Sequence, residues 1–124
     1  MRSILIAERD RSVREVLLDV TRDAFPGTEV QAVESGAAVL QMLDRLRPSA
    51  AVVHWTLAEE QGGECMQRLR QAQVPILLIS AWEIPRGLAS AAPNQEALQK
   101  PFDLADYVEV LRRLLAQNTE APPV

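Results

Sequence analysis

Residues 3–27 read SILIAERDRSVREVLLDVTRDAFPG, and this segment is the strongest indication of the fold class. Ser3 to Ala7 is a short apolar run, too brief for a helix and ended by charged residues, which predicts a buried strand. Ser12 and Glu15 then have the spacing of a capping box. Pro26-Gly27 ends a run of apolar side chains at helical spacing. These side chains are Val13, Val16, Leu17, Val20 and Ala24. We therefore expect a strand followed by a core-facing helix.

This alternation of strand and helix continues along the chain. Further strands are predicted at residues 28–33, 50–54, 74–79 and 97–99. Further helices are predicted after Ser35 as far as Arg47-Pro48, around Met66 and Leu69, and after Asp103. The last helix has an apolar stripe formed by Leu104, Tyr107, Val108, Leu111 and Leu115. Prolines and glycine interrupt residues 81–95, so the fourth helix is expected to be short or irregular.

Five strands alternating with helices predict an α/β protein. The expected architecture is a flavodoxin-like, three-layer (βα)5 fold with a parallel sheet, right-handed crossovers and strand order 2-1-3-4-5. The 124 residues suffice for one domain, which we place at residues 1–118, with residues 119–124 as a tail or the start of a linker.

The composition excludes several functional classes. The chain is 48% hydrophobic and 24% charged, with a formal net charge of -4 and no basic run longer than Arg112-Arg113, so nucleic-acid and membrane partners are not expected. The single cysteine, Cys65, is expected in the core. No signal peptide or membrane-spanning stretch is visible, so a cytoplasmic location is expected.

Polar residues follow the predicted strands. In a sheet of this kind, ligands bind beyond the carboxyl ends of the strands. Those ends carry Glu8, Arg9, His54, Ser80 and Lys100, which are expected to converge on one edge of the sheet, with Asp10 as a further candidate.

At these positions the chain resembles the receiver domains of response regulators. The matching stretches ILIAERDRSVRE, RPSAAVVHW, GGECMQRLR, VPILLISA and QKPF cover nearly the whole chain. In that family two acids after the first strand bind Mg²⁺, and an aspartate after the third strand accepts phosphate from a histidine kinase. A Ser or Thr after the fourth strand and a Lys after the fifth contact the phosphoryl group. The resemblance assigns these positions to Glu8 for the first acid, Ser80 for the hydroxyl and Lys100 for the lysine.

Two residues depart from the family pattern. Arg9 stands in place of the second acid, and His54 in place of the acceptor aspartate. Mg²⁺ binding is therefore expected to be weak or absent, with Glu8 a weak candidate ligand, and no other cofactor is expected. Arg9 has two interpretations: a built-in cation that holds the pocket in one state, or a surface salt bridge.

His54 has three interpretations: a neutral structural residue, a pH-responsive group, or a phosphohistidine. Trp55 and Trp82 are expected near the same edge, either as ordinary packing or as a lid.

The resulting hypothesis is an atypical receiver in bacterial-type signal transduction, a pseudo-receiver that acts by phosphorylation-independent contact with a signalling protein or an attached effector domain. A second copy of the chain, forming a homodimer, is a further candidate partner. A second hypothesis keeps the domain in a phosphorelay, phosphorylated at His54 or elsewhere. A third is a hydrolase with Ser80 as nucleophile, His54 as base and Glu8 as orienting acid; it lacks a G-x-S-x-G motif, and catalysis is not expected.

Overall fold

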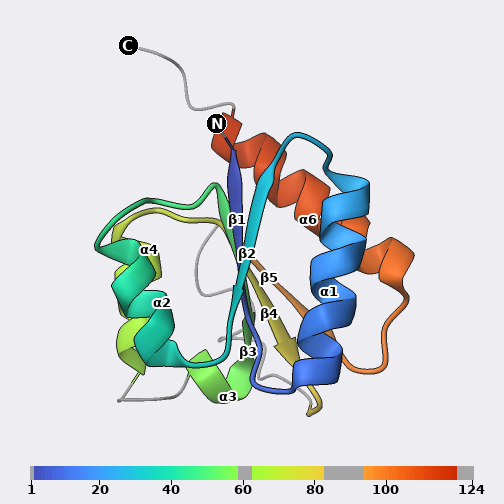
Figure 1. The fold of residues 1–124 in the computed structure, drawn as a ribbon, viewed down its shortest axis with the longest axis horizontal. Helices are drawn as coiled ribbons and strands as arrows, with labels where there is room; N and C mark the ends of the chain where they lie inside the picture. The colour runs from blue at the N-terminus through green and yellow to red at the C-terminus, as the bar shows by residue number, and fades with distance from the viewer. Residues whose placement is uncertain (1, 59–62, 83–93, 120–124) are drawn as a thin grey trace.

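Five parallel strands form a single sheet at the centre of the protein. Figure 1 shows it in a computed structural model, which describes residues 2–58, 63–82 and 94–119. The strands are β1 (Ser3–Ala7), β2 (Glu29–Val33), β3 (Ala50–His54), β4 (Ile76–Ser80) and β5 (Gln95–Gln99). They lie in the order β2-β1-β3-β4-β5, and every neighbouring pair is parallel. The predicted fold class and strand order are confirmed.

Helices cover both faces of the sheet. The described helices are α1 (Arg11–Ala24), α2 (Gly36–Leu43), α3 (Trp55–Ala58), α4 (Glu64–Gln71) and α6 (Leu104–Thr119). In Figure 1, α1 and α6 lie against one face, and α2, α3 and α4 lie against the other. The segment predicted to be a short or irregular helix falls mostly on residues 83–93, outside the described residues. The predicted division at residue 118 stays a prediction.

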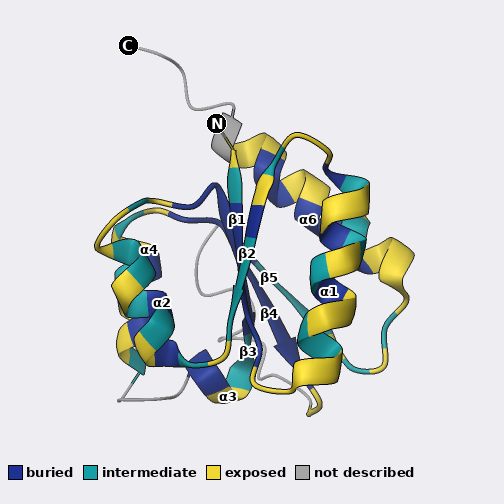
Figure 2. Cartoon of the chain, in the orientation of Figure 1, coloured by how far each residue is buried: buried dark blue, intermediate teal, exposed yellow. Residues whose placement is uncertain are grey.

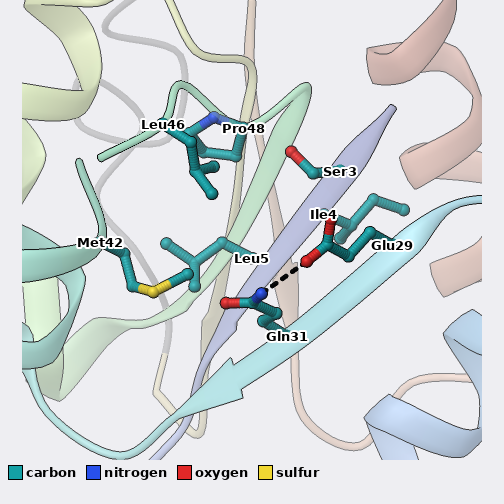
Figure 3. A pocket seen from close by; sticks show the side chains of 8 residues that line it. All are labelled: Ser3, Ile4, Leu5, Glu29, Gln31, Met42, Leu46 and Pro48. Atoms are coloured by element: carbon teal, nitrogen blue, oxygen red, sulfur yellow. Dashed lines mark hydrogen bonds between the residues drawn. The ribbon is translucent and has the colours of Figure 1, made fainter. Parts of the chain in front are cut away.

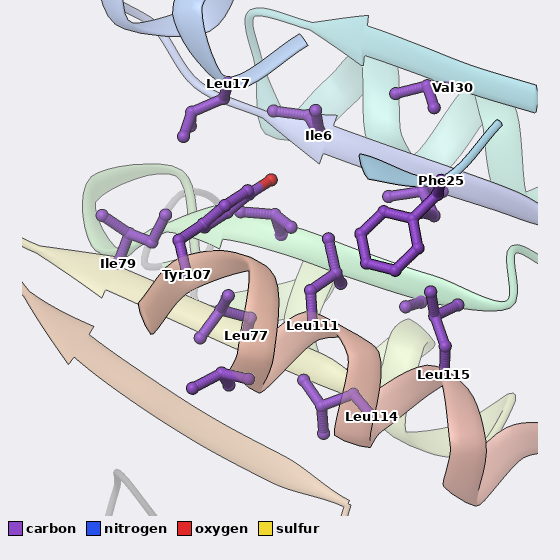
Figure 4. Close-up of a cluster of buried hydrophobic side chains, with 14 residues drawn as sticks. Ile6, Leu17, Phe25, Val30, Leu77, Ile79, Tyr107, Leu111, Leu114 and Leu115 are labelled. Atoms are coloured by element: carbon purple, nitrogen blue, oxygen red, sulfur yellow. The ribbon is translucent and has the colours of Figure 1, made fainter. Parts of the chain in front are cut away.

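The sheet is buried on both faces because its side chains alternate between two cores. In β1, Ile4 and Ile6 belong to the first core cluster, under α1 and α6, whereas Leu5 and Ala7 belong to the second core cluster, under α2, α3 and α4. Every residue of β4 is buried, as expected for a central parallel strand with an unbroken apolar sequence. Figure 2 shows the buried strands between half-exposed helices, and Figure 4 shows the first cluster.

A buried polar contact joins α1 to α6 inside the first cluster. The Thr21 hydroxyl donates to the Leu17 carbonyl at 2.6 Å, so the Tyr107 hydroxyl, 2.7 Å from the Thr21 oxygen, is the donor to Thr21. Burial raises the pKa of Tyr107 to about 12, partly opposed by the hydrogen bond with Thr21. The bond satisfies a hydroxyl that would otherwise be buried without a partner.

Several element boundaries differ from the sequence predictions. Helix α1 begins at Arg11 and is capped by Asp10, whose carboxylate accepts the Val13 N–H at 3.0 Å, so the predicted capping box is wrong. Ser35 caps α2 as predicted, accepting the Ala38 N–H at 3.1 Å, but the helix ends at Leu43, before Arg47-Pro48. Within the described residues, no helix is long and apolar enough to cross a bilayer.

Candidate functional site

The carboxyl ends of β1, β3, β4 and β5 lie side by side, and we call the rim that they form the carboxyl edge of the sheet, or simply the edge. The strand register keeps these ends level, and His54 and Ser80 are the last residues of β3 and β4. Lys100 follows β5, and its backbone N–H donates to the Ser80 carbonyl at 2.7 Å. Glu8 follows β1. The predicted convergence of these four side chains therefore has a direct geometric basis.

Glu8 and Lys100 form an ion pair at this edge. The Lys100 Nζ lies 3.4 Å from Glu8 Oε1, and the exposed fractions of the two side chains are 27% and 4%. The other carboxylate oxygen, Oε2, accepts the Asp10 backbone N–H at 3.0 Å. Both oxygens of this buried carboxylate are thus engaged by groups of the protein itself.

Asp10 and Arg9 both follow β1, but Asp10 caps a helix whereas Arg9 acts on His54 through its charge. Asp10 is exposed and its carboxylate is taken up by the N-terminus of α1, so it is not directed at the other candidate residues. Arg9 is also exposed and acts electrostatically on His54. In the described residues, the cation recorded on the Glu8 carboxylate is Lys100.

Arg14 is a site residue that the sequence analysis missed. Its Nη1 donates to the carbonyls of Glu8 and Arg9, at 3.0 and 3.2 Å, and lies 3.9 Å from the Glu34 carboxylate. The guanidinium therefore fixes the backbone that presents Glu8. A charged residue in the first turn of a helix that follows a strand directly was the available signal.

His54 is held by Thr56. The Thr56 backbone N–H donates to His54 Nδ1 at 3.3 Å, and the Thr56 hydroxyl oxygen lies 2.9 Å from the same nitrogen. Because Nδ1 accepts the N–H, it carries no proton, and the proton of the neutral ring is on Nε2. The tautomer follows from this hydrogen-bond pattern.

The electrostatic surroundings favour the neutral imidazole. Burial lowers the pKa of His54 from its ordinary value of 6.5, Lys100 and Arg9 lower it further, and Glu8 opposes the shift. We expected the nearby cations to be the cause, but desolvation is the largest one.

Ser80 and the two tryptophans complete the edge. Ser80 is buried, and its Oγ accepts the Trp82 backbone N–H at 3.0 Å. Trp82 is 77% exposed, whereas Trp55 is half-buried and packs on the second core cluster. Within the described residues, no hydrogen bond joins Ser80 to His54.

The donor set at this edge does not fit a divalent metal ion. Among the described residues, no group of three or more His, Cys, Asp and Glu side chains is placed to hold one. Glu8 is already bonded at both oxygens, and the neighbouring position supplies a guanidinium, whereas Mg²⁺ requires several oxygen ligands. The expectation of weak or absent metal binding remains a prediction.

A small pocket lies at the other end of the strands, near the amino ends of β1 and β2 and the end of α2 (Figure 3). Its volume is about 10 Å³, enough for one water molecule at most. Glu29 and Gln31 hydrogen-bond to each other at its wall, at 2.7 Å. It offers no competing ligand site.

Comparison with known proteins identifies the family. The family model of the response regulator receiver domain matches residues 4–112. This chain belongs to that family. Among curated relatives, this receiver domain is 33% identical over 121 residues to the response regulator MprA of Mycobacterium leprae (strain TN), covering 93% of the chain and 51% of MprA. It is 28% identical over 125 residues to the DNA-binding transcriptional regulator NtrC of Azospirillum brasilense, covering 98% of the chain and 25% of NtrC. The receiver domain thus spans about half of one relative and a quarter of the other.

Solved structures share the receiver fold. A response regulator receiver protein from Sinorhizobium medicae WSM419 matches with a TM-score of 0.81 and 24% identity, covering 94% of this chain and 96% of that one. The receiver domain of the sensor histidine kinase PA1611 from Pseudomonas aeruginosa PAO1, which holds a magnesium ion in its active-site cleft, matches with a TM-score of 0.74 and 21% identity, covering 93% and 98%. At these identities the likeness concerns the fold.

Proposed function

We propose that this receiver domain signals through protein contacts without accepting a phosphoryl group. One observation carries the proposal: the last residue of β3 is His54, and its Nδ1 lone pair is bonded to Thr56. In the receiver family an aspartate after the third strand accepts the phosphoryl group, and the resemblance implies that His54 stands at the corresponding position. An imidazole has no carboxylate with which to form an acyl phosphate, so the covalent step of the family has no acceptor here.

The neighbouring carboxylates do not replace the missing acceptor. Glu8 is buried, with one oxygen facing Lys100 and the other bonded to a peptide N–H. The Asp10 carboxylate caps α1, where its loss would cost about 1 kcal/mol. Phosphorylation of either side chain would break interactions that hold the strand end in place.

A phosphohistidine at His54 is disfavoured for a related reason. The free lone pair of the neutral ring is on Nδ1, which already accepts from Thr56, while Nε2 carries the proton. Attack by Nε2 on phosphorus would require the proton to move to Nδ1, which would then face the Thr56 N–H. Phosphorylation of His54 would therefore cost the hydrogen bond from the Thr56 N–H before the bond to phosphorus forms, which disfavours the phosphorelay hypothesis.

The hydrolase hypothesis also lacks its geometry. A serine nucleophile must donate its hydroxyl proton to a base, yet no hydrogen bond joins Ser80 to His54 among the described residues. Receiver domains are generally signalling modules rather than enzymes, and we propose the same for this one.

Mg²⁺ plays no part in this proposal. The PA1611 receiver holds magnesium in its cleft, whereas here Lys100 already supplies a positive charge to Glu8. We propose that this internal ion pair takes the electrostatic role that a metal would otherwise have, so that the edge keeps one arrangement without a metal or a phosphoryl group.

The partner in this proposal is a signalling protein or an effector domain attached to the receiver. Support comes from the curated relatives, which are two to four times as long as the matched region, since the chain covers 51% of MprA and 25% of NtrC. The net charge of -4 disfavours nucleic acid as a direct partner of this domain and gives it no attraction to an anionic membrane. Self-association is tested by light scattering over a range of protein concentrations.

A fluorescence titration tests the proposal. Trp55 adjoins His54, and the backbone N–H of Trp82 is bonded to the Ser80 hydroxyl, so both tryptophans lie in the chain next to residues of this edge and serve as reporters. The chain is titrated with Mg²⁺ and beryllofluoride, a phosphoryl mimic, beside the double variant Arg9→Asp/His54→Asp. We expect no saturable change in the native chain and a saturable change in the double variant. Saturable binding by the native chain would contradict the proposal, and His54→Asn serves as the control that removes the imidazole without adding a carboxylate.

A further inference from the structure

His54 stands in the N-cap position of α3. It precedes Trp55, the first residue of that four-residue helix, and its Nδ1 accepts the N–H of Thr56, the second residue. A side-chain acceptor bonded to the N–H two residues further on is the geometry of an N-cap. Asn and Asp usually supply such an acceptor, and here a histidine does so.

We propose that His54 is a proton-controlled cap: the neutral imidazole holds the first turn of α3, and the imidazolium releases it. This inference goes beyond the proposed function, because it concerns an input to the domain that needs neither a phosphoryl group nor a metal.

The proton acts on the bonding nitrogen itself. In the neutral ring, Nδ1 offers its lone pair to two donors of Thr56, the backbone N–H at 3.3 Å and the hydroxyl at 2.9 Å. Protonation converts Nδ1 to an N–H donor that faces the peptide N–H. The hydroxyl can rotate to become an acceptor, whereas the peptide N–H cannot, so the cap is lost at the backbone.

The charged groups around His54 set the pH range of this change. Glu8 faces it from the end of β1, Arg9 from the following residue, and Lys100 from the end of β5. Burial and the two cations lower the pKa of His54 more than Glu8 raises it. The pKa of His54 therefore lies below the ordinary histidine value of 6.5, so the neutral imidazole predominates at pH 7 and takes up a proton at lower pH.

Release of the first turn affects the packing beneath it. The Thr56 N–H belongs to the first turn of α3 (Trp55–Ala58), where backbone N–H groups have no partner within the helix, and His54 satisfies this one. Leu57 is fully buried and Trp55 packs on the same second core cluster. A change at His54 is thereby connected to the core and to an adjacent fluorophore.

Nuclear magnetic resonance tests this inference, because His54 is the single histidine of the chain. The imidazole resonances are followed from pH 7.5 to pH 5, together with the hydrogen-exchange protection factor of the Thr56 amide. We expect protection to fall about five-fold as the imidazole titrates, the factor that corresponds to loss of a typical N-cap. Trp55 fluorescence should change over the same pH range.

Two variants separate the cap from general acid destabilisation. His54→Asn keeps a neutral acceptor at every pH, so Thr56 protection should be retained and independent of His titration. His54→Ala should show the low protection at every pH. An unchanged Thr56 protection factor while the native imidazole titrates would overturn the inference, as would the same pH response in His54→Asn. Neither result depends on whether the domain accepts phosphate, so the two proposals fail separately.

Discussion

Replacement of Lys100 by methionine removes the cation from a buried carboxylate while keeping most of the side-chain volume. Glu8 has 4% of its side chain exposed, so water cannot easily take the place of the ammonium group. Loss of one partner from a buried ion pair typically lowers the free energy of unfolding by about 3–5 kcal/mol, because the remaining charge is left uncompensated.

The expected cost here is smaller, for two reasons. The ammonium side chain is 27% exposed and lies 3.4 Å from the oxygen, and the Asp10 N–H continues to bond the other oxygen. We therefore expect Lys100→Met to lower the free energy of unfolding by about 2 kcal/mol, which corresponds to a fall in Tm of roughly 8 °C for a domain of this size. Glu8→Gln in the same background should recover part of this loss, because it removes the unpaired charge.

Urea unfolding of the two single variants and the double variant gives the coupling energy directly. The matched control is Arg113→Met, which breaks an ion pair with Glu96 that is shorter, at 3.0 Å, but exposed, with 56% and 33% of the side chains accessible. Its loss should cost less than about 1 kcal/mol. Equal costs for Lys100→Met and Arg113→Met, or a coupling energy near zero between Glu8 and Lys100, would show that the buried ion pair does not stabilise the fold.

Three further changes test the fold around the site. Asp10→Ala should lower the free energy of unfolding by about 1 kcal/mol in urea, because the Val13 N–H loses its cap; no change would mean that another group caps α1. Thr21→Val should cost about 2 kcal/mol and Tyr107→Phe only about 1, because the first leaves a buried hydroxyl without an acceptor while the second leaves the Thr21 bond to Leu17 intact; the opposite ranking would contradict the assigned donor. Tyr107 ionises near pH 10 when unfolded but has a pKa of about 12 in the fold, so its contribution is present below pH 10 and lost as pH rises through 12. Thermal unfolding between pH 9 and 12 should therefore show an alkaline loss of stability that is smaller in Tyr107→Phe.

The order of the strands could be predicted from the sequence because each strand is a short apolar run with clear ends. The runs at residues 3–7 and 50–54 match the observed strands at every residue. The fourth and fifth strands were placed less well, at residues 74–79 and 97–99 against Ile76–Ser80 and Gln95–Gln99. In β5 the polar side chains of Gln95 and Glu96 hid a strand whose pairing with β4 depends on backbone hydrogen bonds.

The apolar stripes of the helices overstated burial. Val16 and Leu104 both belong to predicted core-facing stripes, yet they are 48% and 41% exposed. They lie in an apolar groove between α1 and the turn after β5, with a volume of about 600 Å³. Helical spacing indicates which face is apolar, but how far a neighbouring helix covers that face depends on the packing of the two helices.

The members of the site were predictable, but their pairing was not. Strand ends converge by topology, which placed Glu8, His54, Ser80 and Lys100 together. For Arg9 the sequence left open a pairing with Glu8 or Asp10 or a plain surface salt bridge, and it did not indicate the ion pair that the structure shows between Glu8 and Lys100, 92 residues apart. The contact of His54 with Thr56 was not predicted either, because it depends on α3 beginning directly after β3 rather than on any residue pattern.

The absence of a phosphoryl acceptor can be measured as the intact mass of the chain after incubation with acetyl phosphate and Mg²⁺. The native chain should keep its mass, and the Arg9→Asp/His54→Asp variant should gain one phosphoryl group. A phosphoryl adduct on the native chain, mapped by peptide fragmentation to His54, Glu8 or Asp10, would contradict the account.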